Sequence, residues 1–206
     1  MVGWQSFSIR ENTAIMSESN AARSELAALY LGLKSDANTS RENISPTMTG
    51  FWDRTYVRSV FAMFEGVAFA TRQYILAQAA AGRYEITVQE RDLLSEQTFS
   101  LDSKGVIQKK ESFLPFLQGF RLTMTVLGRC LGMARYVTGA FGHNGFESFR
   151  EGVRIRNQIT HPKSPAQMML SRKDIETVKL AERWFDSLLE GLLGTAFEPA
   201  SQTGAS

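Results

Sequence analysis

The sequence is poor in the residues that build disulfides and metal sites. Its 206 residues include one cysteine, Cys130, and two histidines, His143 and His161. A single cysteine excludes a disulfide within the chain and a cysteine-based zinc site, and two histidines are too few for a typical histidine metal cluster. Cys130 lies in an apolar segment and is interpreted as a packed small side chain rather than a nucleophile. We therefore expect no metal ion or other cofactor.

Long hydrophobic runs and common catalytic motifs are also missing. No uncharged apolar run reaches the roughly 18 residues that cross a bilayer, and the first residues, MVGWQSFSIRENTAI, lack the pattern of a signal peptide. We expect a cytoplasmic protein without membrane contact. The sequence has no glycine-rich phosphate loop and no G-x-S-x-G elbow. The net charge of +2 is too small to require a nucleic-acid partner by itself.

Helical periodicity is the main structural signal. The composition is that of a globular protein, with 43% hydrophobic and 21% charged residues. Apolar spacing and capping residues predict helices over residues 18–34, 51–82, 87–95, 115–139, 146–158 and 171–193, with Thr87 and Ser171 as N-caps. Residues around 102–105 suit a hairpin or an extended loop. The sequence therefore predicts an all-α fold, an antiparallel helical bundle.

Composition shifts divide the chain into three parts. Residues 1–50 form an expected N-terminal extension, with one amphipathic helix and a Ser-, Asn- and Thr-rich linker over residues 35–50. Residues 51–197 form the helical domain. Residues 198–206 are small and polar and are expected to form a flexible tail. The final helix should bury a wide apolar face made of Leu180, Trp184, Phe185, Leu188, Leu189 and Leu192.

The most informative stretch is REGVRIRNQITHPKSPAQMMLSRK, from Arg150 to Lys173. It contains six basic residues and one acid, Glu151, a local charge of +5. Such a patch around a helix end suits a phosphate-binding site, with Arg150, Arg154 and Lys163 as candidate contacts. A solvated helix face is the alternative.

Helical geometry singles out Arg156 within this stretch. At about 100° per residue, Phe149, Val153 and Arg156 share one face, where an arginine is costly unless it is paired or borders a cleft. Pro162 disfavours the helical conformation at His161, so the helix should end there. An imidazole at a helix end beside two arginines is suited to proton transfer. The alternative is a histidine that only bonds a helix-end carbonyl.

The residues Arg156-Asn157-Gln158-Ile159-Thr160-His161 have the form R-N-x-x-x-H. This resembles the R-x(4–6)-H motif of the HEPN superfamily, all-α domains found in many ribonucleases of toxin–antitoxin and antiviral defence systems. Arg154 also satisfies the spacing, with six residues between it and His161. The resemblance covers residues 51 to 197.

The resemblance implies a metal-independent ribonuclease that cleaves RNA by attack of its own 2′-OH. His161 would be the general acid/base, Arg156 would stabilise the charged phosphorane, and Asn157 would hold the substrate or tune the arginine. It also implies a homodimer that brings two motifs to one cleft, and an antitoxin or other partner protein. Glu65 would pair with Arg156 or orient it; the alternative is a surface residue with local ion pairs.

Two other functions fit the same residues. The domain could bind RNA or a nucleotide without cutting it. It could also be a helical structural protein in which Arg156 makes a buried ion pair.

Overall fold

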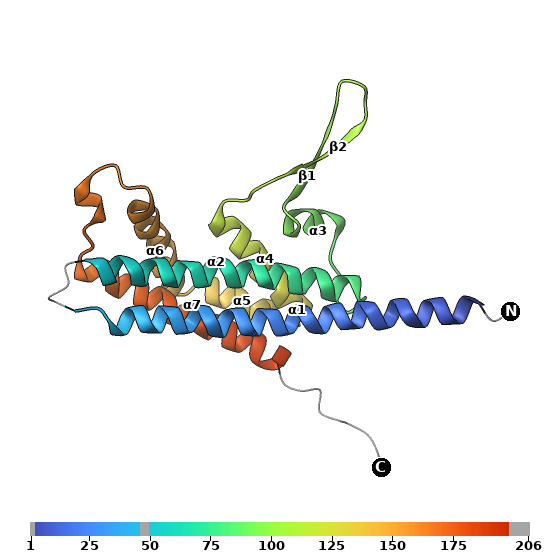
Figure 1. The fold of residues 1–206 in the computed structure, drawn as a ribbon, viewed down its shortest axis with the longest axis horizontal. Coiled ribbons are helices and arrows are strands. Elements are labelled where there is room, and N and C mark those ends of the chain that lie inside the picture. The colour runs from blue at the N-terminus through green and yellow to red at the C-terminus, as the bar shows by residue number, and fades with distance from the viewer. Residues whose placement is uncertain (1–2, 46–49, 198–206) are drawn as a thin grey trace, which may run out of the picture. The chain divides into compact units, whose positions relative to one another are not determined.

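The computed structural model describes the backbone of residues 3–45 and 50–197 and the side chains of residues 18–45 and 50–194. Within this part of the chain the fold is mostly helical (Figure 1). The predicted tail, residues 198–206, and residues 46–49 of the predicted linker lie outside the described residues. Among the helices that the structure describes, none combines the length and the apolar character needed to cross a membrane.

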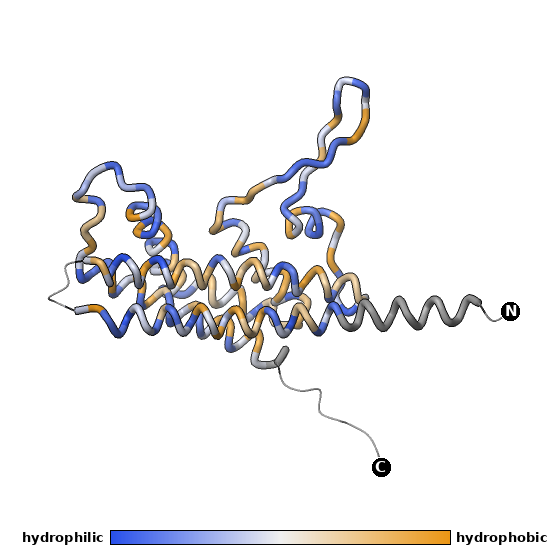
Figure 2. Tube along the Cα trace, in the orientation of Figure 1, coloured by the Kyte–Doolittle hydropathy of each residue, from blue (hydrophilic) through white to orange (hydrophobic). Residues whose placement is uncertain are grey.

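The elements follow one another in a simple order. They are α1 (Gly3–Glu42), α2 (Phe51–Ala80), α3 (Val88–Leu94), β1 (Gln97–Leu101), β2 (Ile107–Glu111), α4 (Phe116–Cys130), α5 (Ala134–Phe141), α6 (Asn144–Thr160), a 3₁₀ turn (Pro165–Met168) and α7 (Arg172–Phe197). Hydrophobic and hydrophilic positions alternate along the long helices, as amphipathic helices require (Figure 2). The prediction of a mostly helical, bundle-like fold is confirmed.

The elements differ from the prediction in several places. Helix α1 begins at Gly3 rather than at residue 18. Helix α1 continues to Glu42, so the predicted linker is wrong for residues 35–42. The predicted helix over residues 115–139 is two helices, because Gly132 has a φ of +72°, which a right-handed helix cannot contain. Residues 97–111 form a two-stranded antiparallel hairpin, with Leu101 opposite Ile107. A hairpin was one of the two conformations predicted here, and its strands mean that the chain is not entirely α-helical. These differences leave the expected order of elements intact.

Both predicted N-caps are observed. At Thr87 the hydroxyl accepts from the amide of Glu90 and the Glu90 carboxylate accepts from the amide of Thr87, a complete capping box. At Ser171 the hydroxyl accepts from the amide of Asp174, and the Asp174 carboxylate accepts from the amide of Ser171. Local sequence therefore determines where α3 and α7 begin.

Packing gathers the chain into two compact units. The first comprises Met1–Asp36 and Ala62–Cys130, and the second comprises Ala37–Phe61 and Leu131–Ser206. In the first unit, α1 and α2 run in opposite directions: Gln78 donates to the carbonyl of Ser19, while Gly66 lies against Leu33. The predicted division between an extension and a domain at residue 50 stays a prediction.

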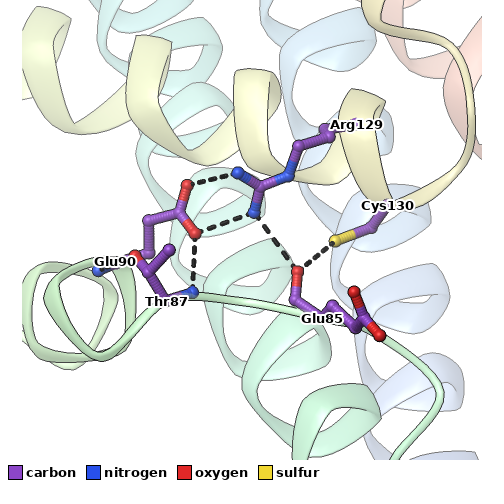
Figure 3. A network of polar contacts seen from close by, with 5 residues as sticks. All are labelled: Glu85, Thr87, Glu90, Arg129 and Cys130. Atoms are coloured by element: carbon purple, nitrogen blue, oxygen red, sulfur yellow. Dashed lines mark hydrogen bonds and ion pairs between the residues drawn. The ribbon is translucent and has the colours of Figure 1, made fainter.

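A polar network joins α3 to the end of α4 within the first unit (Figure 3). The Arg129 guanidinium donates two hydrogen bonds, of 2.8 and 2.7 Å, to the two carboxylate oxygens of Glu90. These bonds lower the pKa of Glu90. The Cys130 thiol points to the carbonyl of Glu85 at 3.9 Å, and burial raises the pKa of the thiol. A thiol with a raised pKa is a poor nucleophile, as expected for a packed cysteine.

The second unit is built on the contact between α6 and α7. Gly152 lies against Ala181, and Gly145 lies against Trp184, so the two helices run in opposite directions. The rings of Phe146, Phe149 and Trp184 are buried and lie within 5.1 to 6.1 Å of one another. These three rings are part of the core of the second unit.

Candidate functional site

Helix α6 carries the R-N-x-x-x-H motif. Residues at or next to each end of the helix determine where it begins and ends. At its start, the Nδ1 atom of His143 accepts a 3.0 Å hydrogen bond from the amide of Gly145. At its end, His161 has a φ of −125° and a ψ of 59°, outside the helical region, as Pro162 requires. The predicted placement of His161 at the end of the helix is confirmed.

Arg156 lies on the buried side of α6. The buried positions of this helix are Gly145, Phe146, Phe149, Gly152, Ile155 and Ile159. On a helical wheel Arg156 falls among them, at about 20° from Phe149, and its side chain is half-buried. Its Nη1 atom donates a 3.0 Å hydrogen bond to the Oδ1 atom of the exposed Asn157. The structure thus brings Arg156 and Asn157 together, with the guanidinium reaching from the apolar face towards the polar one.

His161 joins this pair only through the backbone. Its amide donates to the carbonyl of Asn157 at 3.1 Å. Its ring is exposed and makes no hydrogen bond to any residue that the structure describes. The imidazole can therefore reach a ligand in solvent, but no side chain of the described part of the chain fixes its orientation.

Arg58 is a further cation at the same end of α6, and the sequence analysis missed it. Its Nη2 atom donates a 3.3 Å hydrogen bond to the carbonyl of Ile159, one of the last carbonyls of the helix. A positive charge is favourable at this end of a helix. The pairing joins residues 101 positions apart in the sequence. A local signal could not have found it, since Arg58 occupies an exposed position of α2 that reads as surface.

The loop after the motif is tied back to α6. Gln158 donates a 3.0 Å hydrogen bond from Nε2 to the carbonyl of Gln167, and Gln167 accepts one of 2.7 Å at Oε1 from the amide of Lys163. The Lys163 side chain is exposed. These bonds hold the segment after His161 near the end of α6, where its lysine can meet an anion.

The two candidate phosphate contacts on α6 are engaged with acids. Arg150 pairs with Glu147 at 2.9 Å, and Arg154 pairs with Glu151 at 2.7 Å. The bond from Arg154 lowers the pKa of Glu151 and raises that of Arg154. All four side chains are exposed, so such ion pairs contribute little and can exchange for phosphate contacts. The arrangement also fits the alternative of a solvated helix face.

Glu65 lies in the first unit, whereas the motif lies in the second. Its side chain is half-buried on α2. Its predicted pairing with Arg156 stays a prediction.

Comparisons with known proteins do not extend this description. No family model, no curated protein and no solved structure gives a significant match to the chain. The resemblance to the HEPN superfamily therefore rests on the sequence motif. Among the described residues, no group of three histidine, cysteine, aspartate or glutamate side chains is placed to hold a metal ion.

The second unit contains a cavity that the sequence analysis did not predict. It lies among α5, α6 and α7 and has a volume of about 690 Å³. Its lining includes Arg135, Arg183 and His143, together with the aromatic rings of Tyr136 and Trp184. Leu180 was expected to lie in the core. It is 46% exposed and lines this cavity instead.

Gly145 controls how closely α6 approaches α7 beside this cavity. A Cβ atom at residue 145 would lie 2.5 Å from Cδ1 and 2.6 Å from Cβ of Trp184. We expect Gly145→Ala to lower the free energy of unfolding by about 2 kcal/mol, because the crowded atoms are near the α7 backbone and cannot move away cheaply. Gly139→Ala is the control, since a Cβ atom there meets nothing within 4 Å. Urea unfolding that ranks the two variants equally would contradict the prediction.

Proposed function

We propose that the protein is a metal-independent endoribonuclease of the toxin or antiviral-defence type, built on an antiparallel HEPN-like bundle. One observation carries the proposal. A half-buried arginine on the apolar face of α6 is bonded to the next residue, Asn157, and an exposed imidazole follows at the end of the same helix. An arginine on the apolar face of a helix is costly unless it is paired or borders a cleft.

The reaction would use the substrate's own nucleophile. A base removes the proton from a 2′-OH group, whose oxygen attacks the adjacent phosphorus. The bond from phosphorus to the 5′ oxygen then breaks, and an acid protonates that oxygen. The products are a 2′,3′-cyclic phosphate and a 5′-hydroxyl. His161 is the group that moves a proton, and Arg156 stabilises the added negative charge of the phosphorane.

The remaining cations would hold the RNA backbone. Asn157 bonds Arg156 and keeps the guanidinium at the polar edge of the helix. Arg150, Arg154 and Lys163 extend positive charge along α6 and the loop after it, which suits successive phosphates. Glu65 is proposed to orient Arg156 from α2.

The proposal is tested by incubating the purified protein with mixed RNA in the presence of a chelator and resolving the products on a gel. Cleavage that survives the chelator supports the ribonuclease. A retarded band without cleavage favours an RNA-binding module, and neither result favours a structural protein.

We also propose that the protein forms a homodimer. A dimer that brings two motifs to one cleft would supply two imidazoles, one for each proton transfer, and would cover the half-buried Arg156. The interface should bury more than roughly 1,000 Å². Light scattering at micromolar concentration is expected to give twice the chain mass of 23.0 kDa. A monomeric mass under these conditions would contradict the prediction.

Arg154→Ala should weaken RNA binding without abolishing cleavage. The side chain is exposed and lies on a different stripe of α6 from Arg156, which suits a contact to a backbone phosphate. The slope of log affinity against log salt concentration should become shallower by the amount expected for the loss of one phosphate contact, about 0.7 on a single strand. Titration of a labelled single-stranded RNA at several salt concentrations measures this slope. An unchanged slope would show that Arg154 contacts no phosphate and is only part of a solvated helix face.

A binding module is the second candidate, because the ring of His161 has no orienting bond to the described residues. An unoriented imidazole is a weaker general acid/base than one held by a partner side chain. In this case the same cations would hold RNA or a nucleotide without turnover, and a partner protein or antitoxin could act through that binding.

A further inference from the structure

The cavity among α5, α6 and α7 lies outside the motif. Its lining residues come from positions 135–148 and 180–188, whereas the motif occupies residues 156–161 at the other end of α6. About 690 Å³ is within the range of small-molecule sites in proteins. What the cavity could bind follows from its charge, its apolar surface and its small residues.

We propose that this cavity binds a small anionic amphiphile, a molecule with an apolar body and a single carboxylate or sulfonate group. The inference does not rest on the ribonuclease proposal, because it uses none of the motif residues. The anionic group would lie between Arg135 and Arg183, and the apolar body would lie against Leu180 and the aromatic rings.

Charge is the first argument. Arg135 of α5 and Arg183 of α7 both line the cavity, and its lining contains no acidic side chain. Neither arginine makes a hydrogen bond or an ion pair with the described residues, whereas Arg150 and Arg154 both do. An anion within reach of both guanidinium groups would be stabilised by each of them. Two acids near the lining weaken this field. Burial and then the charge of Glu190 raise the pKa of Tyr136, and the bond to Lys179 and the charge of Arg183 are among the causes that lower the pKa of Glu176.

The apolar surface is the second argument. Tyr136 is 38% exposed and Leu180 is 46% exposed, and both line the cavity, so their apolar surface is open to a ligand. The polar atoms of the two rings are already bonded: the Tyr136 hydroxyl donates to the carbonyl of Ser187 at 2.7 Å, and the Trp184 indole N–H donates to that of Ala140 at 3.0 Å. The rings therefore present apolar surface and need no hydrogen bond from a ligand. This favours a ligand with a hydrocarbon or aromatic body.

Small residues create the space. Gly139, Ala140 and Gly145 all line the cavity. Gly139 is one of the lining residues, and a Cβ atom there would meet nothing within 4 Å, so a larger side chain can be added at the cavity wall without crowding a neighbouring atom. This residue provides a variant that fills the site while the protein remains folded.

The test uses 1-anilinonaphthalene-8-sulfonate, an aromatic sulfonate whose fluorescence rises in apolar sites, with dodecanoate and dodecanol as competitors. The intact protein should bind the probe, and dodecanoate should displace it far better than the neutral alcohol. Gly139→Leu should abolish probe binding. Gly194→Leu is its control, because Gly194 on α7 also has nothing within 4 Å and does not line the cavity.

Arginine variants test the anionic half of the proposal. Arg135→Met and Arg183→Met should each weaken binding of the probe and of dodecanoate about tenfold. Arg172→Met, on the same helix as Arg183 but away from the cavity, should leave both affinities unchanged. Thermal unfolding of each variant separates loss of the site from loss of the fold.

Each other outcome overturns the inference. Equal displacement by dodecanol would show an apolar pocket without anion selectivity. Probe binding that survives Gly139→Leu would place the probe elsewhere. If the folded protein did not bind the probe, the cavity would not be a small-molecule site. Its occupant would then be RNA, a peptide or a second copy of the chain, or it would have none.

Discussion

Arg156→Ala and His161→Ala should each reduce RNA cleavage by a factor of about 10² to 10⁴, while the protein stays folded. The Arg156→Ala variant would lack the cation that faces the phosphorane, and the His161→Ala variant would lack the group that moves a proton. Because both would serve one transition state, the double variant should be barely slower than either single variant. Initial rates on a sensitive fluorescent RNA substrate measure all three.

Two controls make this result interpretable. Arg172→Ala removes an arginine from the basic stretch but not from α6, and should retain cleavage. Thermal unfolding should show an intact transition for both motif variants. Full activity of His161→Ala would overturn the catalytic role and favour the binding module. Loss of the transition in Arg156→Ala would favour a structural role for the arginine.

Glu182→Ala should be the most destabilising single substitution considered for the second unit. Glu182 is 1% exposed in α7, where it accepts a 2.6 Å hydrogen bond from the Tyr56 hydroxyl and one of 3.2 Å from Arg41. Burial and the bond to Glu182 raise the pKa of Tyr56, so its hydroxyl remains a donor at neutral pH. Removing the carboxylate leaves the hydroxyl and the guanidinium without this partner. We expect a loss of about 3 kcal/mol, measured by urea unfolding.

Two matched variants should lower the free energy of unfolding less than Glu182→Ala does. Tyr56→Phe removes one neutral donor and should cost about 1 to 2 kcal/mol. Glu176→Ala removes another α7 carboxylate, which is exposed and pairs with Lys179, and it should change stability little. If Glu182→Ala proved as mild as Glu176→Ala, the buried network would not be a stabilising feature of the second unit.

The sequence determined where α3 and α7 begin and where α6 ends. Thr87 and Ser171 were identifiable because N-caps act on amides within three residues. Pro162 ended α6 at His161 for an equally local reason. The break at Gly132 was missed, because a glycine in an apolar run is compatible with a helix until packing requires a positive φ. The linker was predicted too long, because polar residues 35–42 continue a helix that packing extends.

The placement of Arg156 also followed from the sequence. A helical wheel alone assigned it to the apolar face of α6, and the structure has it half-buried there. The same method could have flagged Glu182, which lies about 20° from Leu189 on α7, on the side that the structure buries. The expected core position Leu180 lies outside that side and is exposed. Helical periodicity gives the directions of side chains relative to one another. To predict which of them are buried, the centre of the buried face must also be known.

Only the tertiary structure decided which distant residues meet. Arg41 and Glu182 are 141 positions apart, and Arg58 and Ile159 are 101 apart. No local pattern encodes such pairs, because they depend on how whole helices pack. The cavity among α5, α6 and α7 has the same origin: its arginines and small residues are unremarkable in the sequence, and they become a site only when two helix faces and a third helix enclose a space. Local chemistry shaped the helices, and packing between them created the surroundings of each candidate site.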